Sequence, residues 1–167
     1  MTIINPNQLH VNRYKYSPLV EHWSQFVSKY PWNWWVTLTF RESKHPEASA
    51  KLYDTFIHTL NKEIFGNRYY KRKNDGVIWC RATEYQNRGA IHYHALIGRV
   101  PGTVRRLDYM DYWDELAGHA RIVAYEKGVG AEGYLAKSCY AFKHGEIDLG
   151  GALELFSQKE DSFGLFG

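Results

Sequence analysis

The stretch from residue 77 to residue 100, VIWCRATEYQNRGAIHYHALIGRV, constrains the fold of this chain more than any other. Both of its arms are rich in β-branched and aromatic residues, and residues 87–89 between them, Asn-Arg-Gly, have the composition of a turn. A three-residue loop with Gly89 in the left-handed position would pair Glu84 with His92. The stretch therefore predicts a β-hairpin, and a loop one residue longer would turn Glu84 to the opposite face.

Three side chains of this hairpin predict a metal site. His92 and His94 are separated by one residue, so both project from the same face of a strand. Glu84, opposite His92, would share that face, with the two Cβ atoms roughly 5 Å apart. Lone histidines are more often surface or hydrogen-bonded residues, and Glu84 could instead pair with an arginine across the sheet. Two imidazoles in an apolar arm need polar partners, however, and with a carboxylate they are typical of a divalent-metal site.

Composition narrows the class of protein. The 167 residues suffice for one domain with a real core, and the net charge of +3 is too small to name a polyanionic partner by itself. Cys80 and Cys139 fit neither a disulfide framework nor a zinc knuckle, which suggests a reducing compartment. The first residues lack the apolar core of a signal peptide, and no run reaches the roughly 20 apolar residues of a membrane span. We therefore expect a soluble cytoplasmic protein that does not engage a membrane.

Hydrophobic periodicity predicts an α+β fold. A helix begins at Pro18, an alternating strand covers residues 34–40, and a second helix runs from Pro46 to Gly66. The hairpin is followed by a helix that ends at Gly118, and then by a short strand at residues 120–125. From residue 34 onward this order is β-α-β-β-α-β, the split or ferredoxin-like arrangement. It predicts an antiparallel sheet with both helices on one face and the other face free.

The alternation of the second hairpin arm decides where the metal site would lie. Ile91, Tyr93, Ala95 and Ile97 point away from the two histidines. If these four residues pack under the helices, the metal site lies on the open face of the sheet.

The predicted domain is single and spans residues 1–167. Its core covers residues 34–143, preceded by an extension with one helix (1–33) and followed by a weakly structured tail (144–167). The core ends in a helix after Gly133, in which Tyr134 and Lys137 share one helix face.

Residues 67–73 form a predicted loop in which cations and aromatic residues alternate. Cations attract phosphates and aromatic faces stack on unpaired bases, so the composition favours contact with nucleic acid. An ordinary solvated loop explains so short a run equally well. The residues in question are Arg68, Tyr69, Tyr70, Lys71, Arg72 and Lys73.

Three short motifs occur in a telling order: TLTF at residues 37–40, HYH at 92–94 with Glu84 upstream, and YLAK at 134–137. Each is weak alone, but the set on the predicted topology is specific. It resembles the three motifs of the HUH endonucleases, the rolling-circle replication initiators of plasmids, single-stranded DNA phages and small DNA viruses. The resemblance covers residues 34–143, most of the chain.

The resemblance implies a mechanism. Glu84, His92 and His94 would hold one Mg²⁺ or Mn²⁺ ion, which binds and orients the scissile phosphate as a Lewis acid. Tyr134 would attack that phosphate, leaving a 5′-phosphotyrosyl bond and a 3′-OH, while Lys137 assists the phenolate, the phosphate or the leaving group. Further DNA contacts would come from Thr37, Thr39, Arg88 and residues 68–73.

The implied partner is single-stranded DNA at a replication origin, near a hairpin. Since the sequence has no Gly-rich phosphate loop, any unwinding would need a host helicase. Tyr140 repeats the Tyr-x-x-Lys spacing but lies six residues from Tyr134, about 240° around a helix, so it is interpreted as a packing residue.

Three alternatives stay open. A single-tyrosine HUH transposase would use the same chemistry to join donor and target ends. A non-catalytic ferredoxin-like module could bind single-stranded nucleic acid on its sheet, but would leave the histidines, Glu84 and Tyr134 unexplained. A metal oxygenase with two histidines and one carboxylate fits the ligands but not the topology or the Tyr-x-x-Lys helix.

Overall fold

The computed structural model of the chain describes residues 18–86, 90–128 and 147–152. Within those ranges, none of the helices combines the length and apolar character needed to cross a membrane. The elements in chain order are α2 (Pro18–Val27), β1 (Trp32–Thr39), α3 (Pro46–Phe65), the 3-10 turn η1 (Tyr69–Lys71), β2 (Ile78–Tyr85), β3 (Ile91–Gly98), α4 (Arg106–Leu116), β4 (Ala120–Ala124) and β5 (Ile147–Gly151).

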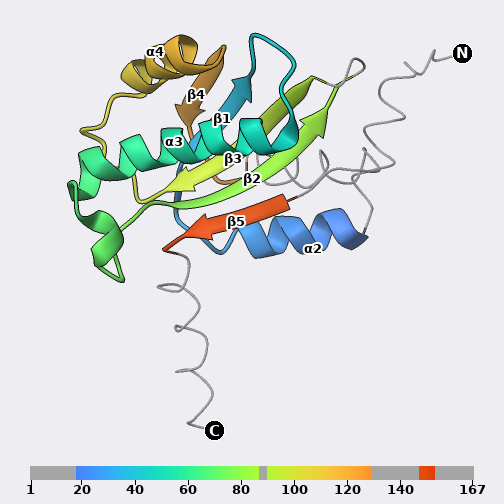
Figure 1. Ribbon diagram of the computed structural model, residues 1–167. Coiled ribbons are helices and arrows are strands. Elements are labelled where there is room, and N and C mark those ends of the chain that lie inside the picture. The colour runs from blue at the N-terminus through green and yellow to red at the C-terminus, as the bar shows by residue number, and fades with distance from the viewer. Residues whose placement is uncertain (1–17, 87–89, 129–146, 153–167) are drawn as a thin grey trace, which may run out of the picture.

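The five strands form one antiparallel sheet in the order β4-β1-β3-β2-β5. Strands β1 to β4 with the intervening α3 and α4 have the order of a split βαβ fold, compatible with the predicted ferredoxin-like arrangement. Both helices cover the same face of the sheet (Figure 1), which we call the helix face. Strand β3, which carries the two histidines, lies at the centre of the sheet.

The helix face carries the larger core. Tyr53 and Phe56 of α3 and Trp113 of α4 are fully buried against it. From the sheet, Ile91, Tyr93, Ala95 and Ile97 belong to the same cluster, so the prediction that these four pack under the helices is confirmed. The opposite side chains of β3 therefore point to the other face, which we call the site face.

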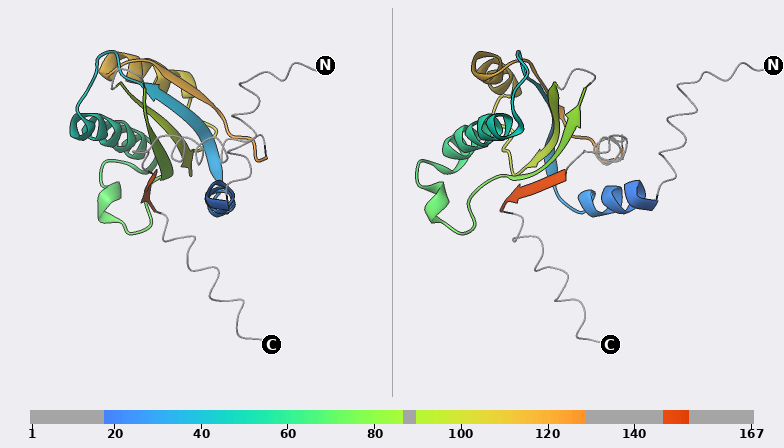
Figure 2. Two further views of the ribbon diagram at one scale, coloured as in Figure 1. Left: turned by 90° about the vertical axis from the view of Figure 1, so that its right-hand side faces the viewer. Right: turned by 45° about the vertical axis from the view of Figure 1, so that its right-hand side comes forward.

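The site face is not wholly free, as the sequence had led us to expect. One half of it has its own apolar cluster, and α2 lies on this side of the sheet, opposite to α3 and α4 (Figure 2). A register shift between Trp32 and Trp34 sends Trp32 into this cluster and Trp34 into the core under the helices. The cluster consists of Val27, Trp32, Ile78, Cys80, Ala82, Leu96 and Ala152.

The expectation that the tail is weakly structured from residue 144 is wrong for β5. This strand pairs with β2, placing Asp148 opposite Arg81 and Leu149 opposite Cys80. Its two glycines give the segment a low β-propensity, which hid it in the sequence. The packing requires one of them, because a Cβ at Gly150 would lie 2.2 Å from a ring carbon of Trp79.

Candidate functional site

The two central strands bring the predicted site residues together. Glu84 on β2 lies opposite His92 on β3, as the sequence predicted, and the Gln86 amide donates to the Ala90 carbonyl at 2.9 Å. On the other side of β3, β1 places Thr37 opposite His94 and Thr39 opposite His92. Since opposed residues share a face, all of these side chains except that of Ala90 project onto the polar half of the site face. Register and alternation alone thus assemble the cluster.

Glu84 contacts the farther of the two imidazoles. His94 Nε2 lies 2.6 Å from Glu84 Oε2, the length of a charge-assisted hydrogen bond. The contact runs diagonally across the strand pair, which a side chain as long as glutamate can span. On its other edge, His94 Nδ1 lies 3.3 Å from the Thr37 hydroxyl. His94 is buried and Glu84 half-buried, so the pair is shielded but reachable from solvent.

His92 completes the cluster at a more exposed position. The side-chain amide nitrogen of Gln86 lies 3.4 Å from His92 Nδ1, and turning the amide by 180° would offer an acceptor instead. Partial burial lowers the pKa of His92 below its usual range, Glu84 raises this pKa, and His94 lowers it. These opposing influences mean that the three groups lie within electrostatic reach of one another.

The donor set fits a hard divalent cation, although within the described residues no three His, Cys, Asp or Glu side chains are already arranged as a metal-binding cluster. Two neighbouring ligand atoms at the roughly 2.1 Å bond length of an octahedral Mg²⁺ ion lie about 3.0 Å apart. His94 Nε2 and Glu84 Oε2 would therefore have to separate by only about 0.4 Å from their 2.6 Å contact. With Nδ1–H donating to the Thr37 hydroxyl, Nε2 would present its lone pair to the ion.

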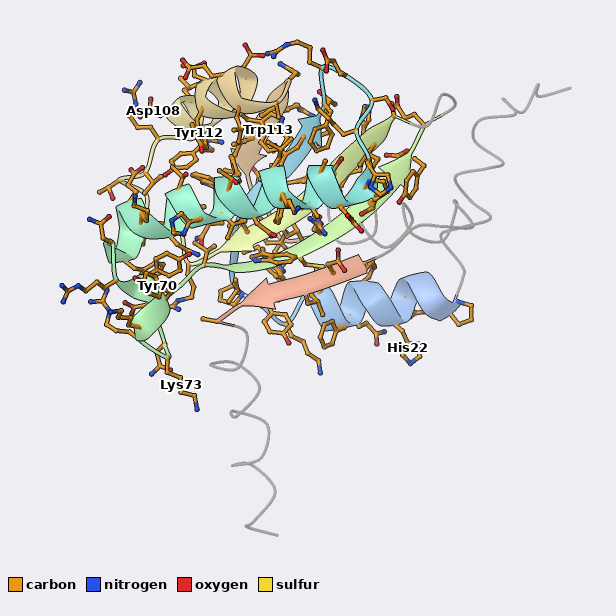
Figure 3. The ribbon with its side chains drawn as sticks, viewed as in Figure 1. His22, Tyr70, Lys73, Asp108, Tyr112 and Trp113 are labelled. Carbon is orange, nitrogen blue, oxygen red and sulfur yellow. The ribbon has the colours of Figure 1, made fainter. Side chains whose placement is uncertain are left out.

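Thr39 has a different environment from Thr37. Its backbone N–H and its hydroxyl both donate to the His119 carbonyl, at 2.8 and 3.0 Å, and its own carbonyl accepts from the Trp113 indole at 3.0 Å. Gly118 permits this approach, because a Cβ there would lie 2.2 Å from the Thr39 oxygen. Trp113 reaches the strand from α4 (Figure 3). Thr39 therefore anchors the end of β1.

Comparison with known proteins then gives the family. The model of the replication-associated protein ORF2 family matches residues 33–143, more than half of the chain. The chain belongs to this family. Neither the curated proteins nor the solved structures gave a match. Membership indicates a role in replication initiation and disfavours the metal-oxygenase interpretation.

The structure of this replication-associated family member leaves some predicted residues apart from the cluster. Residues 68–73 follow α3 and precede β2, at the end of the sheet opposite to Glu84 (Figure 1). Six residues of strand separate Ile78 from Glu84, a distance of about 20 Å. Tyr134, Lys137 and Arg88 lie outside the described residues, although Tyr134 and Lys137 fall within the range matched by the family model.

One residue of the family member's cluster was missed in the sequence. Gln86 contacts His92, and the signal was available, because Gln86 lies two positions after Glu84 on the same strand arm and so shares its face.

Proposed function

We propose that this protein nicks and rejoins single-stranded DNA to initiate rolling-circle replication. The proposal is carried by one observation, the register that gathers Glu84, His92 and His94 on one half of the site face, with His94 and Glu84 in direct contact. The three side chains would hold one Mg²⁺ or Mn²⁺ ion, which when bound supplies Lewis-acid stabilisation of the charge on the scissile phosphate.

The chain's own residues would do the rest of the chemistry. The Tyr134 oxygen attacks the phosphorus, a new O–P bond forms, and the bond from phosphorus to the 3′ oxygen breaks. The phenol loses its proton, the departing oxygen gains one as the 3′-OH, and the 5′ end stays on the protein as a phosphotyrosine. Lys137 would stabilise the phenolate or the leaving oxygen. Because the phosphodiester energy is retained in this linkage, a later 3′-OH can reverse the step and rejoin the strand.

Covalent connectivity allows Tyr134 to reach the cluster. Strands β4 and β5 form the two edges of the sheet, four strand spacings or about 19 Å apart. The 19 peptide steps between Gly128 and Ile147 could span about 60 Å when extended, so chain length does not restrict Tyr134 to one side of the sheet.

The test is a covalent-capture assay. The protein is incubated with a pool of single-stranded oligonucleotides and Mn²⁺, and the DNA that stays attached after denaturation is sequenced. We expect an adduct that disappears with chelator, in Tyr134→Phe and in His92→Ala at every Mn²⁺ concentration, while Tyr134→Phe still binds DNA. Tyr140→Phe is the matched control and should keep the adduct.

Two results would contradict the proposal. An adduct that survives in Tyr134→Phe would move the nucleophile elsewhere, and full activity of His92→Ala would remove the metal from the mechanism. DNA binding without any adduct would favour a non-catalytic module. Joining of donor ends to a second target would favour transposition, which the match to a replication-associated family speaks against.

A further inference from the structure

The segment between α3 and β2, residues 66–76, is held in a fixed shape, and we call it the basic turn. Tyr69 Oη lies 2.8 Å from His58 Nδ1 of α3. Arg72 donates to the Phe65 carbonyl at the end of that helix and pairs with Asp75 within the turn. Tyr69 and Arg72, both predicted DNA contacts, thus hold the turn against the protein.

The other end of the basic turn is fixed from β3. Arg99 Nη1 donates to the carbonyls of Asn74 at 2.7 Å and Gly76 at 2.8 Å, and the guanidinium lies 5.1 Å from the centre of the Phe65 ring. Arg99 has a φ of 63°, a left-handed conformation that costs of order 1 kcal/mol for a residue with a side chain. A loop that was merely solvated would not need a strained residue to pin it.

The remaining side chains of the turn face solvent. Tyr70 is 66% exposed, the largest exposure among the large apolar side chains that stand out as exposed in the described residues. Its ring packs edge-on against the anchored Tyr69, with Lys71 Nζ 6.0 Å from its centre. Arg68, Lys71 and Lys73 are exposed and form no ion pair within the part of the chain that the structure describes. Lys73 extends away from the body of the protein (Figure 3).

We propose that the basic turn is a second binding site for single-stranded DNA, separate from the metal-binding cluster. Tyr70 would stack on a base, and Arg68, Lys71 and Lys73 would contact the neighbouring phosphates. An exposed ring can stack only on an unpaired base, which favours a single strand over a duplex. Because Tyr69 and Arg72 fix the backbone in advance, little conformational entropy is lost on binding.

Naming the bound strand as the one that is cut rests on the proposed function, and geometry then sets its length. The turn begins about 20 Å from the cluster along the sheet, equal to at least about six nucleotides at the 3.4 Å spacing of a stacked strand. A strand of eight nucleotides or fewer would engage one site, and a strand of 25 could engage both.

The test compares fluorescent (dT)8 and (dT)25 by anisotropy at several salt concentrations. Wild type should bind (dT)25 at least tenfold more tightly than (dT)8. The triple variant Tyr70→Ala/Lys71→Ala/Lys73→Ala should lose that advantage, keep its (dT)8 affinity within twofold, and show a (dT)25 salt slope shallower by about 1.4 for the two lost lysines. Tyr70→Phe should bind like wild type. Lys51→Ala/Arg106→Ala removes two exposed cations from the helices over the opposite face and is the matched control.

Each other outcome overturns the proposal. Wild-type affinity in the triple variant would leave the turn without a role, and an equal loss on (dT)8 and (dT)25 would make it part of the primary site. Tighter, turn-dependent binding of a 25-base-pair duplex would assign the turn to paired DNA. Failure of wild type to prefer (dT)25 would also remove the second site. The covalent-capture assay judges the proposed function separately, because adduct formation on a short strand does not need the turn.

Discussion

Arg81 and Glu84 lie three residues apart on β2, on opposite faces of the sheet, and their surroundings differ sharply. Arg81 is 8% exposed on the helix face, where its guanidinium carbon lies 4.4 Å from the ring centre of Tyr93 and 4.7 Å from that of Tyr53. It pairs with Asp148 of β5. Aromatic rings and one carboxylate thus enclose the arginine, and its role is to bind β5 to the sheet.

Glu84 has polar neighbours and an approach from solvent. Its carboxylate contacts His94, lies across from the half-exposed His92, and follows the small side chain of Ala82 on the same face. Strand alternation has therefore placed one charge where rings surround it and another where a ligand can reach it. Burial marks the difference on the helix face as well, since it raises the pKa of Tyr53 despite the opposing charge of Arg81. A buried charge alone does not indicate a reactive site; its neighbours decide.

The largest effect that we expect is on stability, at the enclosed pair. Asp148→Ala leaves the guanidinium buried without a carboxylate, and the free energy of unfolding should fall by about 3 kcal/mol in urea denaturation. Arg81→Met combined with Asp148→Ala removes the buried charge and should recover most of that loss. Nicking by the folded single variant should stay within twofold of wild type. A double variant less stable than the single one would show that the guanidinium stabilises the core without its partner.

Glu84→Gln should give the converse result. Glutamine can still accept the hydrogen bond from His94, so the free energy of unfolding should change by less than about 0.5 kcal/mol. The lost negative charge should weaken metal binding and reduce the nicking rate about 100-fold, equal to about 2.7 kcal/mol. Isothermal titration with Mn²⁺ and single-turnover nicking measure the two effects. Wild-type Mn²⁺ affinity in this variant would exclude Glu84 as a ligand.

Much of the fold could be predicted, because periods of two and of about four residues mark the strands and helices of the core. The hairpin register followed from a three-residue turn, and the helix face followed from Ile91, Tyr93, Ala95 and Ile97. The sequence did not reveal β5, because its stability depends on Arg81 and on the close fit of Gly150 against Trp79, contacts between residues far apart in the chain.

The candidate site was predictable to the same depth. Alternation placed Glu84, His92 and His94 on one face, but it could not show that the carboxylate reaches diagonally to His94. The two threonines looked equivalent, and their difference arises from the loop between α4 and β4, where the His119 carbonyl engages Thr39 alone. Such side-chain choices depend on tertiary packing rather than on periodicity.

The two threonines make a matched pair for the next effect. Thr37→Val removes the hydroxyl beside His94 Nδ1 and should weaken Mn²⁺ binding about tenfold, because an outer partner orients the ligating imidazole. Thr39→Val removes the bond to the His119 carbonyl and should cost about 1 kcal/mol of unfolding free energy with Mn²⁺ affinity unchanged. Titration calorimetry and urea denaturation of both proteins check this, and equal Mn²⁺ affinities would leave Thr37 without a role at the site.

The smallest effect that we expect is on the titration of His92 in the metal-free protein. Burial holds its pKa below the ordinary 6.5, and the Glu84 charge opposes that shift. Glu84→Gln should therefore lower the His92 pKa further, which the ring-proton signals in an NMR titration can follow. A depressed histidine pKa contributes stability that is present above the unfolded-state pKa and lost as pH falls through the folded-state pKa, because the unfolded chain takes up the proton first. The variant should thus lose more stability on acidification than wild type does. A His92 pKa that rises in Glu84→Gln would mean that the carboxylate acts there by displacing water rather than by its charge, and the contrast with the enclosed Arg81 would then rest on solvent access alone.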